Sequence, residues 1–304
     1  MDNILLRAAN AADTSDKCRS HDTKQKYEFT SETKEFVYEL RKECGERHVS
    51  LRRIRRLSDG LVGGWIERWD NLDQDGDCFI YDNAIVFGEA RVGGNATVGG
   101  DAIIYDNAVI TDLAKVCGSA KIYQGAKVCD NAQVYESSQV YGRAQVYDNA
   151  TICGKAKVYD EAKVCGDCIV NGNAVIAGDV KVGDDARVSD YAEIAGKSYI
   201  CGNACVNANA YVKDSFVADN ATVCGVAKIG PYAMILDNSY VTGHVTLHDT
   251  TILGSSKIEG NIKIESGSYV ASITSEKRAL TEDEYSEEKE WLDIIKQYRL
   301  GSCE

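Results

Sequence analysis

Histidine is the side chain best suited to proton transfer near neutral pH, and this chain of 304 residues has only four of them. His244 and His248 lie four residues apart, with Asp249 next to the second, so this group could supply a general base or bind a metal ion. His21 and His48 are far away in the sequence. The simpler interpretation is that His244 and His248 are ordinary surface residues, and we predict no metal site.

Cysteine is the second reactive residue type, with twelve copies in the chain. Cys165 and Cys168 have the spacing of a redox or zinc pair, but no second pair completes a zinc site. Most cysteines recur at fixed places in the repeat described next, where they alternate with other residue types. We therefore expect free thiols in a reducing compartment and no cofactor.

A six-residue repeat must position all of these side chains. Every sixth residue from Ile80 to Val212 is valine or isoleucine, and a small residue, mostly alanine, comes four positions after it. Strand alternation places the β-branched residue and the small residue two positions before it on the same inward face. Glycine, aspartate and asparagine fill the turn between them, because they tolerate a left-handed backbone or bond to their own backbone.

Three repeats form one triangular coil of eighteen residues. The residue after the β-branched position changes in blocks of three repeats, from Cys-Tyr-Cys at 117, 123 and 129 to three tyrosines and back again. This period predicts an all-β, single-stranded parallel β-helix of about eleven triangular coils over residues 79–270. The register slips by one residue after Val212 and again before Ile252, which we interpret as irregular corners. Cys117 and Cys153 would then lie two coils apart, roughly 9 to 10 Å, which exceeds the reach of a disulfide.

Positions eighteen apart should stack on each other, which places aromatic side chains in a line on one flat face. One interpretation is that this line of side chains has a structural role, since stacked rings stabilise parallel strands. An exposed aromatic patch is equally a candidate protein interface. The five rungs of this predicted ladder are Phe87, Tyr105, Tyr123, Tyr141 and Tyr159.

Aspartates should likewise follow one edge of the coil. Turn chemistry alone explains aspartate at corners. The alternative is that a line of carboxylates imitates a phosphate backbone and occupies a basic groove. The residues of this acidic corner are Asp112, Asp130, Asp148, Asp167, Asp184 and Asp185.

The repeat resembles the hexapeptide-repeat superfamily, whose members form left-handed β-helices and often trimerise. Upstream, KYEFTSETKEF, LRRIRRL and GLVGGWIERWDNLDQDGDCFIYDNA resemble the N-terminal cap of a bacterial and phage-encoded group called YdcK-like. The resemblance to that group implies no particular activity for this chain. Most enzymes of the superfamily are acyltransferases that use a histidine base, and residues 79–243 contain no histidine.

Both ends of a β-helix need covers, because an open end would pair with another chain. Residues 1–78 are predicted to form an N-terminal segment and cap, with short strands over 26–76 and with Trp65 and Trp69 plugging the first coil. Residues 271–304 are predicted to be a linker and an α-helix from Thr281 to about Leu300. This helix would pack on its own solenoid or on another subunit through an apolar stripe of Trp291, Ile294, Ile295 and Tyr298.

Composition narrows the function classes. A net charge of −13 argues against direct binding of nucleic acid, and no segment has the length or apolarity of a membrane span or a secretory signal. We expect a cytoplasmic protein that forms homo-oligomers, with a trimer favoured. The preferred interpretation is a non-enzymatic binding protein of phage or prophage type that engages and inhibits a host nucleic-acid-handling or defence protein. An architectural or virion scaffold and an acyltransferase using His244 or His248 are the alternatives.

Overall fold

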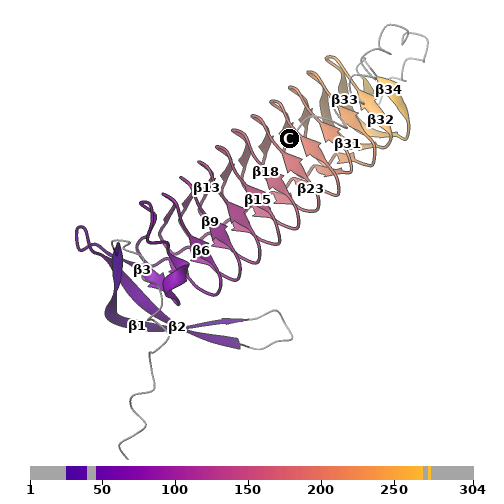
Figure 1. Ribbon diagram of the computed structural model, residues 1–304. Helices are drawn as coiled ribbons and strands as arrows, with labels where there is room; N and C mark the ends of the chain where they lie inside the picture. Colours follow the sequence, from indigo (N-terminus) through magenta and orange to yellow (C-terminus); the bar gives the residue numbers. More distant parts are fainter. Residues whose placement is uncertain (1–24, 40–45, 270–272, 275–304) are drawn as a thin grey trace, which may run out of the picture.

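The computed structural model describes residues 25–39, 46–269 and 273–274. The chain winds into a left-handed parallel β-helix of about eleven turns, as the repeat predicts (Figure 1). Each full turn has three short strands, which stack on the strands of the next turn and so build three flat faces. Within the described residues, no helix is long and apolar enough to cross a membrane.

Faces 1 and 2 belong to one 24-stranded sheet, because β31 (Tyr240–Leu247) and β33 (Lys257–Ile264) continue round the corner between them. Face 1 also contains β4 (Phe79–Ile80), β7 (Thr97–Val98), β10 (Lys115–Val116), β13 (Gln133–Val134), β16 (Thr151–Ile152), β19 (Ile169–Val170), β22 (Arg187–Val188), β25 (Cys205–Val206), β28 (Thr222–Val223) and β35 (Ile273–Thr274). Face 2 also contains β5 (Ile85–Val86), β8 (Ile103–Ile104), β11 (Lys121–Ile122), β14 (Gln139–Val140), β17 (Lys157–Val158), β20 (Val175–Ile176), β23 (Glu193–Ala195), β26 (Tyr211–Lys213) and β29 (Lys228–Ile229).

Face 3 is a separate eleven-stranded parallel sheet. Its strands are β6 (Arg91–Val92), β9 (Val109–Ile110), β12 (Lys127–Val128), β15 (Gln145–Val146), β18 (Lys163–Val164), β21 (Lys181–Val182), β24 (Tyr199–Ile200), β27 (Phe216–Val217), β30 (Met234–Ile235), β32 (Thr250–Ile252) and β34 (Gly267–Tyr269).

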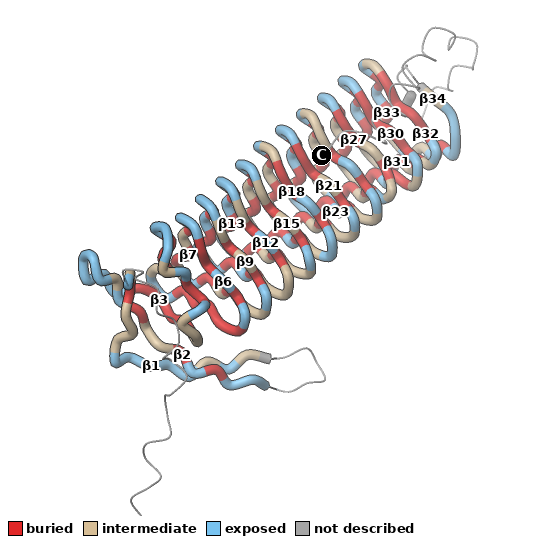
Figure 2. Tube along the Cα trace, viewed as in Figure 1, coloured by how far each residue is buried: buried red, intermediate tan, exposed pale blue. Residues whose placement is uncertain are grey.

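The core is the inside of the triangle, and it is filled by the two inward positions of every repeat. The inward valines, isoleucines and alanines have essentially no exposed surface, whereas the corners are exposed (Figure 2). Corner residues have positive φ, as at Asp148 (57°) and Gly166 (70°). A Cβ on Gly166 would lie 2.6 Å from the backbone nitrogen of Asp184 in the next coil, so this corner requires glycine.

The coil length is eighteen residues, since Lys121 pairs with Gln139 across neighbouring strands. It shortens to seventeen at two places, where Tyr199 pairs with Phe216 and Met234 pairs with Thr251. The strands remain parallel and paired across both places. The two register slips in the sequence are therefore irregular corners within one continuous solenoid.

The N-terminal cap differs from the predicted short strands. β1 (Tyr27–Glu39) and β2 (Glu46–Arg56) form a long antiparallel hairpin, and β3 (Val62–Ile66) joins β2 to β5 of the first coil. Trp65 does not plug the coil, because Ile66 takes the inward position and Trp65 points to the outer side with Phe87. Trp69 does pack against the end of the core, as predicted, with its ring centroid 4.5 Å from that of the buried Tyr27, whose hydroxyl donates to the Trp69 carbonyl at 2.7 Å.

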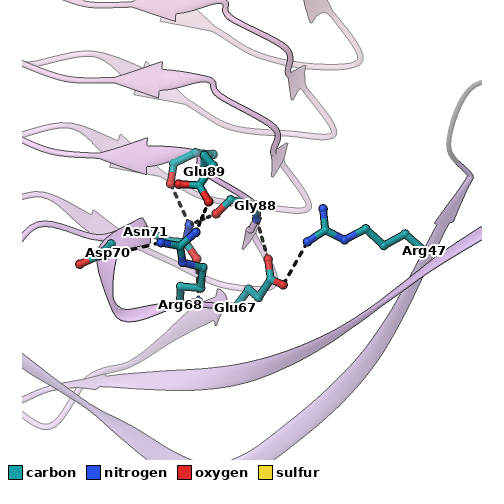
Figure 3. Close-up of polar contacts among 8 residues, drawn as sticks. Arg47, Glu67, Arg68, Asp70, Asn71, Gly88 and Glu89 are labelled. Atoms are coloured by element: carbon teal, nitrogen blue, oxygen red, sulfur yellow. Dashed lines mark hydrogen bonds and ion pairs between the residues drawn. The ribbon is translucent and has the colours of Figure 1, made fainter. Parts of the chain in front are cut away.

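Polar contacts join the hairpin to the first coil beside the short 3₁₀ helix η1 (Trp69–Asn71) (Figure 3). The Glu67 carboxylate accepts a hydrogen bond from the Gly88 backbone at 2.7 Å and pairs with Arg47 at 3.4 Å. Arg68 forms an ion pair with Glu89. These contacts fix the orientation of the cap on the β-helix.

The predicted C-terminal helix lies outside the described residues. Its apolar stripe of Trp291, Ile294, Ile295 and Tyr298 is therefore not placed.

Candidate partner-binding face

The aromatic residues predicted to stack do stack, on the outer side of face 2. The ring centroids of Tyr105 and Tyr123 are 4.9 Å apart, and those of Tyr123–Tyr141 and Tyr141–Tyr159 are each 4.8 Å apart. The planes of neighbouring rings differ by only 4° to 6°. We call Tyr105, Tyr123, Tyr141 and Tyr159 the tyrosine ladder. All four are half-buried, so one edge of each ring reaches solvent.

Phe87 is stacked on Tyr105 but is not part of an exposed surface, which corrects the predicted five-rung patch. Its centroid lies 5.2 Å from that of Tyr105, yet only 1% of its surface is exposed. The reason is the hairpin, because Phe36 and Tyr38 of β1 pack on Phe87 at 5.7 and 4.9 Å. Tyr38 also reaches Tyr105 at 5.4 Å, and the rungs beyond Tyr105 extend past this contact.

Polar and basic side chains flank the ladder on the same strands. Lys121, Gln139 and Lys157 lie on the outer side, two residues before the corresponding tyrosines. A shallow hollow of about 340 Å³ adjoins them at the corner between faces 1 and 2. It is lined by Ser137, Gln139, Lys155, Lys157, Asn173 and Val175. Burial, and to a smaller extent the nearby carboxylates of Asp160 and Glu193, raises the pKa of Tyr159, so its hydroxyl stays protonated. The ladder thus has Lys121 and Lys157 on one side and the carboxylates of Asp106 and Asp160 on the other.

The acidic corner lies between face 3 and face 1, and its carboxylates have a structural role. Asp112 accepts a hydrogen bond from the backbone N–H of Asp130, which in turn accepts one from Asp148 at 3.2 Å. Asp148 and Asp184 accept bonds from glycine N–H groups one coil further on, at 3.0 and 2.8 Å. Each aspartate has positive φ and remains exposed, so it closes its corner and still presents charge to solvent.

Asp167 and Asp185 belong to a neighbouring column of the same corner. They follow the positive-φ residues Gly166 and Asp184 by one position. Asp167 accepts a bond from the side-chain amide of Asn149 at 2.8 Å, where its column is otherwise rich in asparagine. The predicted single line of carboxylates is therefore two parallel columns.

The two candidate catalytic histidines do not form a joint site. His244 lies within β31 and His248 follows its last residue, with the two Cα atoms at most about 13 Å apart, and neither histidine is in a cluster of three possible metal ligands among the described residues. His244 is exposed and aligns with Asn261 of β33. The His248 ring lies over Gly230 of the preceding coil.

Nine described cysteines are free thiols. Cys168 is buried and Cys165 nearly so, and burial raises the pKa of Cys168 to about 12. Among the described residues, only Cys129 with Asp112 and Asp130 brings three possible ligand atoms within 4.8 Å of one another. Burial, followed by Asp130, raises the pKa of Cys129 to about 11, so the free sulfur is protonated at neutral pH.

Two surface features were missed by the sequence analysis. Met234, Leu236 and Leu253 are apolar residues on the outer side of face 3, and Met234 stands where lysine and glutamine occur in earlier coils. Tyr232 occupies a positive-φ corner position (64°) and is 65% exposed. The signal for both was a break in the repeat pattern.

One family match lies within the repeats. A family described as the YdcK beta solenoid repeat matches residues 144–160. The Escherichia coli (strain K12) protein named uncharacterized acetyltransferase YdcK is 40% identical over 81 residues. That match spans 24% of this chain and 24% of the relative, so about a quarter of the relative's length is covered.

Solved structures of two acyltransferases are also similar to this chain. The Arabidopsis UDP-N-acetylglucosamine acyltransferase has 16% identity and a TM-score of 0.33, over 65% of this chain and 79% of that one. The UDP-N-acetylglucosamine O-acyltransferase of Moraxella catarrhalis has 18% identity and a TM-score of 0.27, over 78% and 84%. From its repeat, its three-faced coil and its sequence matches, the chain is a hexapeptide-repeat left-handed β-helix protein that resembles the YdcK-like group.

Proposed function

We propose that this protein is a non-enzymatic binding protein that presents face 2 to a macromolecular partner. The observation that carries the proposal is the tyrosine ladder, in which four parallel rings form a flat, half-exposed aromatic strip. Tyrosine is enriched at protein interfaces because its ring buries a large area while its hydroxyl stays hydrogen-bonded. The strip is held rigid by the solenoid, so binding costs little conformational entropy.

The flanking residues indicate the chemistry of the surface that fits the ladder. Lys121 and Lys157 place positive charge beside the rings, and Gln139 between them adds donors and acceptors. A complementary surface would have acidic groups opposite these lysines, basic groups opposite Asp106 and Asp160, and apolar side chains that contact the ring edges. An oligomer contact with another copy of the chain, such as a trimer, is the architectural version of the same proposal.

The finer version of the proposal identifies the partner as a host protein that handles nucleic acid or acts in defence. In this version the chain is of phage or prophage type and inhibits that protein. Its support is the net charge of −13 and the exposed aspartates of the acidic corner, which would occupy a basic groove. This surface is distinct from the ladder, so separate variants test the two.

The ladder is tested by capture of partners on the immobilised full chain. The double variant Tyr123→Ser/Tyr141→Ser removes two neighbouring rungs, and we expect it to lose the partner. Tyr191→Ser is the matched control, because Tyr191 is 65% exposed and lies outside the ladder. Equal capture by both variants, with both folded by circular dichroism, would contradict binding through the ladder.

The acidic corner is tested by removing charge without removing the corner bonds. Asparagine tolerates positive φ and keeps an oxygen acceptor, so Asp130→Asn/Asp148→Asn should fold normally. We expect this variant to bind a basic partner more weakly and with a smaller salt dependence. Asp190→Asn is the control, since Asp190 forms the same kind of bond at a different corner, away from the ladder. If all three proteins bind alike, the acidic corner has only its structural role.

A second candidate function is acyl transfer, which rests on the name of the matched Escherichia coli relative. It predicts binding of an acyl-coenzyme A and loss of activity in His244→Ala or His248→Ala. Calorimetric titration of the full chain with acetyl-coenzyme A distinguishes this candidate from a binding protein. Absence of both binding and turnover would remove it.

A further inference from the structure

A second apolar surface lies at the C-terminal end of face 3. Ala218, Met234, Leu236 and Leu253 are 5% to 9% exposed and form one cluster with Phe216 and Cys201, which we call the C-terminal patch. These side chains point away from the core, because the alternating residues Val217, Ile235 and Ile252 fill the inward positions. Apolar outward residues that are nevertheless buried need an explanation.

The earlier coils of face 3 show how unusual this patch is. Lys127 and Lys163 occupy the same outward column as Met234, and both are exposed. At the other end of the solenoid, the outward residues Ile85 and Phe87 are buried because the hairpin covers them. Every described member of the C-terminal patch comes from face 3 itself. In the column of Leu236 and Leu253, the earlier residues Cys165 and Gly183 are also buried, so the patch differs from the earlier coils in the size of its apolar side chains.

An aromatic hollow of about 520 Å³ adjoins the patch at the corner between faces 2 and 3. It is lined by Lys197, Tyr199, Asp214, Ser215, Phe216, Pro231 and Tyr232. Tyr232 has a φ of 64°, a conformation that most other corners give to glycine or aspartate and that is costly for a bulky residue. A strained, exposed aromatic side chain next to an apolar patch is typical of a binding site.

We propose that residues 275–304 of the same chain dock on the C-terminal patch and its hollow. These thirty residues follow Thr274 of the last described strand, at the same end of the solenoid as the patch. A helix from Thr281 to about Leu300 would be roughly 30 Å long, whereas the patch extends over four coils spaced about 4.8 Å apart. The segment is therefore long enough to cover the patch.

The chemistry of the segment matches that of the surface. Its predicted apolar stripe contains Trp291 and Ile295, which suit the apolar patch and the aromatic hollow. Its acidic side chains outnumber its basic ones, nine to five. On the solenoid, Lys197 is exposed and lines the hollow together with Asp214. The apolar parts of the segment and of the patch are thus matched in chemistry.

The proposal is tested by hydrogen exchange on the full chain at two protein concentrations. In the unmodified protein, we expect protected amides within residues 288–300 at both concentrations. The double variant Leu236→Ser/Leu253→Ser should raise exchange in that segment on the order of tenfold or more. Val109→Ser is the control, because Val109 is outward and half-buried on face 3 but lies far from the patch.

The variant Tyr232→Asp should weaken docking of the segment without lowering the stability of the solenoid. Aspartate is the most frequent non-glycine residue at positive-φ corners, so the solenoid should lose no stability, while exchange in residues 288–300 should rise. Unprotected amides in the unmodified chain, or protection unaffected by Leu236→Ser/Leu253→Ser, would overturn the proposal. Protection that appears only at the higher concentration, together with a dimer by light scattering, would overturn it in favour of a second copy as the occupant.

Discussion

Replacement of Tyr141 by alanine tests whether the tyrosine ladder stabilises the solenoid by stacking. Tyr141 stacks on Tyr123 and on Tyr159, so the variant loses two ring contacts. Each aromatic pair contributes about 0.5–1.5 kcal/mol, and the lost burial of a half-buried ring adds about 1 kcal/mol. We expect Tyr141→Ala to lower the free energy of unfolding by about 2–4 kcal/mol.

Tyr159 is the end rung, because alanine occupies the equivalent position, 177, in the next coil. Tyr159→Ala loses one ring contact and should cost about 1 kcal/mol less than Tyr141→Ala. The difference corresponds to roughly 2–4 °C in Tm. Tyr147→Ala is a further control, since Tyr147 is half-buried on face 3 with Cys129 and Cys165 as its neighbours eighteen residues away.

The assay is thermal and urea denaturation followed by far-ultraviolet circular dichroism. The expected order of destabilisation is Tyr141→Ala, then Tyr159→Ala and Tyr147→Ala. An equal loss for all three would refute the claim that stacking contributes, and would attribute the cost to burial alone. Tyr141→Phe keeps the ring and should stay close to the unmodified protein.

Two further predictions concern the acidic corner. Asp148→Ala loses the bond to the Gly166 N–H and places alanine at a φ of 57°, so it should lower the free energy of unfolding, measured in urea, by about 2–3 kcal/mol. Asp148→Asn should lower it by less than about 1 kcal/mol. An equal loss for both variants would contradict the role of aspartate as a corner residue. Burial, followed by Asp130, raises the pKa of Cys129 to about 11, so its alkylation, measured by mass spectrometry, should reach half its maximal rate near pH 11. Asp130→Asn should lower that midpoint only in part, because burial is the larger cause, and a midpoint near pH 8.5 in the unmodified chain would contradict the burial of this thiol.

The repeat could be predicted because it is local in the sequence. The series from Ile80 to Val212 defines the inward positions, and the eighteen-residue period correctly places Tyr123 beside Tyr141. Aspartate at corners follows from its tolerance of positive φ, which the structure has at Asp148. Each of these inferences needs only residues within one or two coils.

The cap could not be predicted in the same way. Phe36 and Phe87 are in contact although fifty-one residues separate them, and no period links their positions. The hairpin that joins them depends on antiparallel pairing of β1 with β2, whose register is set by the whole hairpin and by its attachment to β3. The predicted five-rung patch therefore missed a cover that comes from outside the repeat.

In a solenoid, residues that obey the repeat are already explained by the fold, so functional residues are found where the repeat is broken. Asp148 is exposed and charged, but its carboxylate closes a corner, and its presence says little about a partner. Tyr232 is different, because its corner would accept aspartate or glycine at lower cost. The tyrosine ladder is intermediate, since its rings stabilise the coils and also face solvent. The strength of each functional inference therefore depends on how much of the residue's role the fold leaves unexplained.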